Sequence, residues 1–186
     1  MTAGAVLTGG SSRRMGTDKA FVEVDGVPMA ERVAAALSGG GCSPVSYVGG
    51  DVALLARFGR TVHADRFPGA GPLGGVLTAL AALGDVLVAA CDLPLLDAAT
   101  VTRLLVAARA APDAPVIVAR TDRVEPALAV WRTTAVPAIE AHWAAGGRAL
   151  HGALDVLDVV TVPVEVGAMR NVNTLAELSA TPRHPT

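Results

Sequence analysis

Short apolar runs alternate with longer amphipathic stretches along most of the chain. Apolar runs that end at glycine or a polar residue are typical of buried strands. The strands predicted in this way cover Ala3–Thr8, Val45–Val48, Thr61–Ala64, Asp85–Ala90, Val116–Ala119, Ala127–Trp131 and Val159–Val164. Helices are predicted over Pro28–Leu37, Leu73–Leu83, the stretch from an Asp97 cap to Ala110, most of Thr134–Leu154, and Thr174–Ser179. This alternation predicts an α/β sandwich with a mostly parallel sheet.

Composition is consistent with one folded domain and excludes several partner classes. The chain has 186 residues, of which 52% are hydrophobic, and it shows no internal repeat. We therefore expect a single domain over residues 1–180 and a flexible tail over 181–186. A net charge of -2 without a block of like charges gives no reason to expect a nucleic-acid or membrane partner. Two cysteines and no secretory leader pattern favour the cytoplasm.

The topology indicates where a ligand would bind. In mostly parallel sheets, ligands lie at the carboxyl ends of the strands. The loops that follow Thr8, Ala64 and Ala90 should therefore carry the chemistry.

The first of these loops, from Leu7 to Lys19, has the composition of a polyphosphate cradle. Its glycines allow close backbone approach, while two arginines and a lysine suit phosphate oxygens. Thr17 and Asp18 separate Gly16 from Lys19, so the loop is not a P-loop. Lys19 is the only lysine in the chain. An exposed loop with solvated arginines is the alternative interpretation.

The same loop carries a long motif. The pattern Leu-x-Gly-Gly-x-Ser-x-Arg-Met-Gly-x-Asp-Lys resembles the signature of the molybdenum cofactor guanylyltransferases. The matching residues are Leu7, Gly9, Gly10, Ser12, Arg14, Met15, Gly16, Asp18 and Lys19. The related cytidylyltransferases for the same cofactor usually read Ala-Gly at Gly9-Gly10, and this difference favours GTP.

The resemblance implies both a fold and a site. The fold is a three-layer α/β/α sandwich of the nucleotidyltransferase, Rossmann-like type. Arg14, Lys19 and Asp92 would be the catalytic residues. The implied nucleotide-binding residues are Leu7, Thr8, Gly9, Gly10, Ser12, Arg14, Gly16, Lys19, Asp65, Gly71 and Asp92.

The second loop, Asp65 to Gly75, permits two interpretations. It resembles the family segment Asp…Pro-Gly-x-Gly-Pro-Leu-x-Gly, in which the aspartate lies near bound GTP. Residues 69–74 also fit Gly-x-Gly-x-x-Gly, with Asp92 near the expected acidic spacing for a dinucleotide-binding oxidoreductase. That motif should leave the first strand directly, which this segment does not do.

Asp92 stands directly after a buried strand and before Pro94. A carboxylate there can hold Mg²⁺, which binds few protein carboxylates together with substrate phosphates and water. Helix capping is the alternative role, but Asp97 already fits the cap. The family's Cys-Asp-x-Pro motif implies that Asp92 is a magnesium ligand. Cys91 is expected to be a packed residue and not a nucleophile.

The C-terminal half provides weaker candidates. Arg123–Trp131 resembles the region where these enzymes begin to face the second substrate. Arg148 could contact an anionic pterin phosphate, or it could be a solvated surface residue. Asn171 and Asn173 resemble the family's terminal Asn-Val-Asn-Thr motif, although Asx turns and a helix cap would also account for them.

The resemblance implies transfer of GMP from GTP to the terminal phosphate of molybdenum-loaded molybdopterin, with pyrophosphate as the second product. GTP and molybdopterin would be the substrates, Mg²⁺ the cofactor, and molybdoenzymes or their chaperones further partners. Two alternatives remain open: a cytidylyltransferase for the same cofactor, and a non-catalytic GTP-binding partner in cofactor delivery. A dinucleotide-binding oxidoreductase is a more remote alternative.

Overall fold

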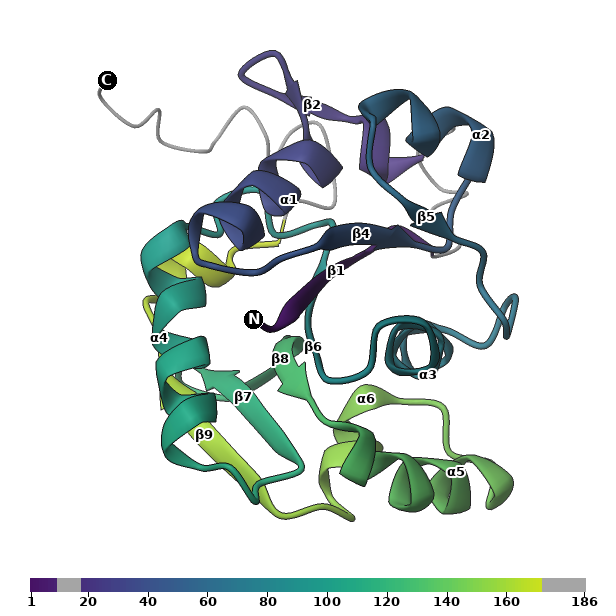
Figure 1. The fold of residues 1–186 in the computed structure, drawn as a ribbon, viewed down its shortest axis with the longest axis vertical. Helices are drawn as coiled ribbons and strands as arrows, with labels where there is room; N and C mark the ends of the chain where they lie inside the picture. Colours follow the sequence, from purple (N-terminus) through teal and green to yellow (C-terminus); the bar gives the residue numbers. More distant parts are fainter. Residues whose placement is uncertain (10–17, 172–186) are drawn as a thin grey trace.

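The computed structural model describes residues 1–9 and 18–171, and in this part of the chain seven strands form one sheet (Figure 1). The strand order is β5-β4-β1-β6-β8-β7-β9. The strands are β1 (Ala3–Leu7), β4 (Val45–Val48), β5 (Val62–His63), β6 (Val86–Ala90), β7 (Val116–Arg120), β8 (Val124–Trp131) and β9 (Val159–Pro163). A separate hairpin pairs β2 (Glu23–Val24) with β3 (Val27–Pro28).

The sheet is mostly parallel, as predicted. β1 pairs in parallel with both β4 and β6, β4 with β5, and β7 with β9. The exception is β8, which is antiparallel to β6 and β7. A short connection over residues 121–123 joins β7 to β8, and a hairpin of that length permits only antiparallel pairing.

Apart from a short helix over Val52–Leu55, which was not predicted, the helices fall close to their predicted positions. They are α1 (Met29–Gly39), α2 (Val52–Leu55), α3 (Pro72–Leu83), α4 (Ala98–Ala110), α5 (Val136–Ala144) and α6 (Leu150–Leu154). Short 3₁₀ turns cover η1 (Lys19–Phe21), η2 (Ala56–Phe58), η3 (Thr133–Ala135) and η4 (Val166–Met169). None of the helices described is both long and apolar enough to cross a bilayer.

Two of the predicted helical regions differ in detail from the sequence-based expectations. Pro28 belongs to β3, where it pairs with Glu23, so the first helix begins at Met29. The helical region expected over Thr134–Leu154 breaks between α5 and α6, where Gly146 adopts a φ of 93°. The helix expected over Thr174–Ser179 lies outside the described residues. Asp97 is the predicted cap, and its Oδ1 accepts a hydrogen bond of 2.7 Å from the Thr100 amide.

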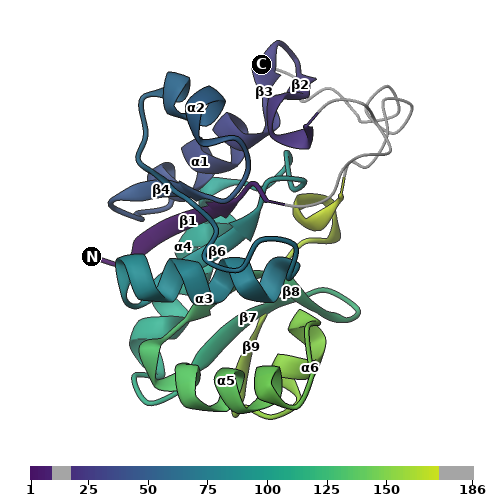
Figure 2. The same ribbon diagram turned by 90° about the vertical axis from the view of Figure 1, so that its right-hand side faces the viewer.

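Helices cover both faces of the sheet and make the expected three-layer sandwich (Figures 1 and 2). On one face, Val6, Leu87 and Leu128 belong to the core beneath α1 and α4. On the other face, Ala5 and Val88 belong to the core beneath α3, α5 and α6. Neighbouring residues of β1 and of β6 thus bury on opposite faces, which is why these two strand sequences are continuously apolar.

Gly40, which directly follows α1, packs closely against the first turn of α4. A methyl group at this position would lie 2.4 Å from the Val101 Cβ and 2.9 Å from the Ala98 carbonyl oxygen. The Val101 side chain is buried and the Ala98 oxygen belongs to the backbone, so neither can move away from an added methyl group. The α1–α4 packing therefore depends on glycine at this position.

Gly40→Ala is expected to lower the free energy of unfolding by about 1–3 kcal/mol, because the added methyl overpacks the α1–α4 contact. Gly167→Ala serves as the control, since a methyl group there meets nothing within 4 Å. Urea unfolding monitored by circular dichroism measures both. Equal stability of the two variants would contradict the packing described.

Candidate active site

Two loops leave the sheet side by side at the carboxyl ends of β1 and β6. These strands pair in parallel from Ala3 with Val86 to Leu7 with Ala90. The pairing continues past the strands, because the Cys91 amide donates to the Leu7 carbonyl at 3.1 Å. Thr8 and Asp92, the next residues of each loop, are thereby held at one edge of the sheet.

Lys19 and Asp92 meet at this edge. The Lys19 ammonium lies 3.5 Å from Asp92 Oδ2, with side-chain exposures of 20% and 23%. Lys19 begins the turn η1, which is capped by Asp18 through a 3.1 Å hydrogen bond from the Ala20 amide to Oδ1. The lysine of the predicted phosphate-binding loop therefore lies next to Asp92, the acidic residue that follows β6.

A cavity of about 380 Å³ opens around this ion pair. Its polar lining comprises Thr8, Gly9, Asp18, Lys19, Asp92 and Asn171. Four of these six positions, all except Asp18 and Asn171, were predicted to bind nucleotide, and Asn171 was predicted to contact phosphate or the second substrate. Residues from both ends of the chain thus come together over the carboxyl edge of the sheet.

The remaining wall of the cavity is apolar and contains a helix N-terminus. Leu7, Ala127 and Leu150 contribute side chains, and Pro72 is the first residue of the twelve-residue helix α3. Gly71 is the N-cap of α3 and has a φ of 76°, a conformation that suits glycine. The N-terminus of a helix carries unpaired amides and a partial positive charge, both of which favour a phosphate.

Beside Gly9, at the edge of the cavity, the loops that follow β1 and β4 are in close contact. The Thr8 hydroxyl lies 3.1 Å from the Val48 carbonyl oxygen and 2.9 Å from that of Gly49. A methyl group at Gly49 would lie 3.0 Å from the Gly9 Cα, and its φ is 79°. The loops after β1 and β4 therefore touch through their backbones.

Asp65 lies next to this contact. A methyl group placed on Gly9 would be 3.9 Å from Asp65 Oδ2. Asp65 Oδ1 accepts hydrogen bonds from the Phe67 amide at 2.9 Å and from the Thr78 hydroxyl at 3.3 Å. One carboxylate oxygen is thus engaged in holding the loop against α3, while the other faces the first loop.

A β-bulge brings Ala127 to the cavity. Along β7 and β8, Val118 pairs with Ala129, but the next residue, Ala119, pairs with Glu125. The intervening residues of β8 have no partners in β7, and bulges of this kind redirect side chains. The segment predicted to begin the second-substrate region therefore contributes to the cavity wall through Ala127.

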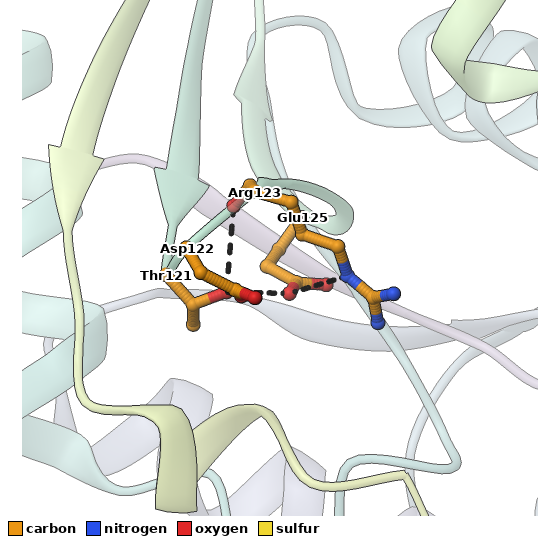
Figure 3. A network of polar contacts seen from close by, with 4 residues as sticks. All are labelled: Thr121, Asp122, Arg123 and Glu125. Atoms are coloured by element: carbon orange, nitrogen blue, oxygen red, sulfur yellow. Dashed lines mark hydrogen bonds and ion pairs between the residues drawn. The ribbon is translucent and has the colours of Figure 1, made fainter.

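Polar contacts brace the hairpin that carries this bulge (Figure 3). The Thr121 hydroxyl lies 2.8 Å from Glu125 Oε1 and 2.9 Å from Asp122 Oδ1. Arg123 Nε donates to Glu125 Oε1 at 3.1 Å. The Glu125 side chain is only 14% exposed, so these contacts hold the start of β8 in place.

Arg148 lies on a tryptophan and not in the cavity lining. Its guanidinium is 4.1 Å from the centre of the Trp143 ring, and Nη1 donates to the carbonyl oxygens of Trp143 and Gly147 at 2.7 Å each. Trp143 in turn packs on Phe67 with ring centres 5.2 Å apart. The contact of Arg148 with a pterin phosphate therefore stays a prediction.

Several predicted site residues cannot be placed. Gly10, Ser12, Arg14, Gly16 and Asn173 lie outside the described residues. Conversely, the sequence gave no indication that Leu150 lines the cavity, and for Ala127 it gave only the family resemblance of Arg123–Trp131. Their apolar character predicts only burial, and their position depends on the β8 bulge and on the α5–α6 break.

The site suits a metal that takes most of its ligands from substrate and water. Within residues 1–9 and 18–171, no group of three or more His, Cys, Asp or Glu side chains could enclose a metal ion. Asp92 offers a single partly exposed carboxylate at the cavity. Such a donor fits Mg²⁺, which binds through one or two carboxylates together with phosphates and water.

Cys91 is unsuited to nucleophilic chemistry. The pKa of its thiol is raised to about 12, mainly by burial and in addition by the negative charges of Asp92 and Asp18, while Lys19 acts in the opposite direction. The thiol therefore stays neutral at physiological pH. Burial also raises the pKa of Cys42 to about 12.

The fold and the site together define an α/β nucleotidyltransferase, with a lysine and an aspartate at the carboxyl edge of the sheet. Comparison with known proteins supports the same class. The profile of the MobA-like NTP transferase domain matches residues 4–158. The chain belongs to this family.

Individual relatives are similar over most of their length. A protein of Opitutus terrae named "Probable molybdenum cofactor guanylyltransferase" is 37% identical over 80% of this chain and 75% of its own. The molybdenum cofactor guanylyltransferase of Cupriavidus metallidurans is 33% identical over 94% of this chain and 91% of its own. The crystal structure of molybdopterin-guanine dinucleotide biosynthesis protein A from Archaeoglobus fulgidus superposes with a TM-score of 0.82 at 26% identity, covering 97% and 96% of the two chains.

We expect both cysteines to resist alkylation at pH 8, because a thiol with a pKa of about 12 has roughly a thousandfold less thiolate than an unperturbed one. Mass spectrometry after iodoacetamide treatment of the folded protein measures this. The denatured protein is the control and should be alkylated at both positions. Rapid alkylation of folded Cys91 would contradict its assignment as a packed residue.

Proposed function

We propose that this protein transfers GMP from GTP to the terminal phosphate of molybdenum-loaded molybdopterin and releases pyrophosphate. The observation that carries the proposal is the meeting of Lys19 and Asp92 in one cavity at the carboxyl edge of the sheet. The names of the relatives supply the substrate class. The Gly9-Gly10 pair favours GTP over CTP, because the related cytidylyltransferases usually have Ala-Gly at these positions.

The nucleotide would occupy the side of the cavity formed by β1 and α3. Thr8 and Gly9 line this side of the cavity, and Asp65 lies beside Gly9. Gly71 is the N-cap of α3, and Pro72 is its first residue. This arrangement offers amides to phosphates and a carboxylate to the remainder of the nucleotide. Leu7 lines the same wall. Gly10, Ser12, Arg14 and Gly16 stay predictions from the motif.

Asp92 would hold Mg²⁺ together with oxygens of the triphosphate. Nucleotidyltransferases of this type typically use a divalent metal. When bound, the ion neutralises charge on the phosphates and orients them for in-line displacement. Lys19, 3.5 Å from Asp92 Oδ2, would place its ammonium on the same phosphates.

The reaction requires positioning more than proton transfer. An oxygen of the acceptor phosphate is already ionised, so it can attack the α-phosphorus without a general base. A new bond forms from that oxygen to the α-phosphorus, and the bond to the bridging α–β oxygen breaks as pyrophosphate leaves. Lys19 stabilises the charge that grows on the phosphates. Asn171, which lines the cavity, would contact the acceptor phosphate through its amide.

The first experiment compares GTP with CTP. Pyrophosphate release is measured with Mg²⁺ and purified protein, in the presence and absence of molybdenum-loaded molybdopterin. We expect release with GTP that requires the pterin. Release with CTP alone would assign the protein to the cytidylyl branch. Nucleotide binding without release would support a partner in cofactor delivery and contradict the proposed activity.

Lys19→Ala should lower turnover by about 10²–10³-fold while the protein stays folded, because a donor aimed at transition-state charge is lost. Arg103→Ala removes a positive charge from the exposed side of α4 and is the matched control. Steady-state pyrophosphate release measures both. An unchanged rate in Lys19→Ala would exclude this residue from the mechanism.

Asp92→Asn should raise the magnesium concentration needed for half-maximal rate, because an amide oxygen binds a hard cation less well than a carboxylate does. A magnesium titration of the rate measures the effect. Asp113→Asn, an exposed acid before β7, is the control for net charge. Superimposable titrations of wild type and Asp92→Asn would contradict the ligand assignment.

A further inference from the structure

Arg32 bonds to both segments that carry the ion pair. It lies on α1, and its Nε donates to the Pro94 carbonyl at 3.0 Å while Nη1 donates to the Val24 carbonyl at 3.1 Å. Pro94 is two residues beyond Asp92, and Val24 ends the strand that follows η1 and Lys19. One guanidinium therefore joins the loop after β6 to the segment after the cradle.

The geometry of arginine suits this double contact. The guanidinium is a rigid planar fork, so bonds from Nε and Nη1 fix its two acceptors relative to each other. The nearby Asp25 carboxylate, 3.7 Å from Nη1, is 62% exposed. An ion pair as exposed as this contributes little, so the two carbonyl bonds account for the position of Arg32.

Backbone hydrogen bonds connect the two acceptors of Arg32 to the segments that hold Lys19 and Asp92. The Val22 amide donates to the Lys19 carbonyl at 3.1 Å, and the Met29 amide donates to the Val22 carbonyl at 2.8 Å. On the other side, the Leu93 amide donates to the Ala90 carbonyl at 3.4 Å. Each half of the ion pair thus stands in a short, hydrogen-bonded segment whose far end is held by Arg32.

We infer that Arg32 is a positioning residue, which sets the separation of the Lys19 ammonium and the Asp92 carboxylate without touching substrate. The part of this inference that concerns catalysis rests on the proposed function. The part that concerns the geometry of the Lys19–Asp92 ion pair does not depend on it. Arg60 provides a matched comparison. Its side chain is 27% exposed, as is that of Arg32, and it also bonds to α1, but through Glu31 and Ser38.

The first test observes Lys19 directly. Because it is the only lysine, labelling with ε-¹³C-lysine gives a single side-chain methylene signal in a two-dimensional NMR spectrum. Asp92→Asn calibrates the position of this signal when the contact with the carboxylate is lost. We expect Arg32→Met to shift the signal towards that position, and Arg60→Met to leave it at the wild-type value. A wild-type signal in Arg32→Met would overturn the inference.

Arg32→Lys serves as a second variant that keeps the charge. A single ammonium cannot reproduce the fork, so the lysine signal of residue 19 should still move. The peak of the new lysine is identified from the same Arg32→Lys change in a Lys19→Arg background. If Arg32→Met does not fold, Arg32→Lys alone decides. An unmoved Lys19 signal in this variant would also contradict the positioning role.

Kinetics then separate positioning from general stability. We expect Arg32→Met to lower kcat roughly 10- to 100-fold, with a much smaller change in the KM for GTP. In a Lys19→Ala background the same change should lower kcat by less than about 3-fold, because residues that act through one contact are not additive. Equal losses in both backgrounds would overturn the inference. Absence of activity in the wild type would instead contradict the proposed function, and the NMR measurement would still decide the role of Arg32.

Discussion

Parallel pairing of β1 with β6 is the constraint on which the site depends. The two strands run in register from Ala3 and Val86 to Leu7 and Ala90, and the Cys91 amide extends the pairing by one further bond. Both loops consequently leave the sheet at one edge and in one direction. Lys19 and Asp92, which come from distant parts of the chain, can then serve a single ligand. The core on either face of the sheet keeps this pairing fixed.

Electrostatics at the site follow from this placement. One ammonium and one carboxylate lie 3.5 Å apart, and both are about four-fifths buried. Together with the N-terminus of α3, they form a region that can accept the charge of a triphosphate and a metal ion. The neutral thiol of Cys91 behind them takes no part, because burial and two neighbouring acids keep it protonated.

Much of this arrangement follows from local patterns in the sequence. Strands β1 and β6 at the centre of the sheet are continuous apolar runs, and the cap at Asp97 was predicted from residue type and position. Asp92 and the first loop were predicted at strand ends, and the structure brings Lys19 and Asp92 together. The single domain over residues 1–180 and the tail over 181–186 stay predictions.

Features that depend on long-range contacts could not be predicted in this way. The antiparallel direction of β8 follows from the short β7–β8 hairpin, and the bulge in β8 includes Ala127, which lines the cavity. Arg32 resembles any other helix-surface arginine in the sequence. Its role is visible only once Pro94 and Val24 are near each other. Arg148 had two plausible environments, and its stacking on Trp143 depends on where α5 ends.

The central claim is that the cavity aligns the α-phosphorus of GTP with an acceptor phosphate. Reaction with GTP labelled by ³²P at either the α or the γ position tests it most directly, with separation of the pterin product from pyrophosphate. The account predicts that α label enters the pterin product and that γ label appears only in pyrophosphate. Appearance of γ label in the pterin product, or of α label in inorganic phosphate, would contradict nucleotidyl transfer at this site.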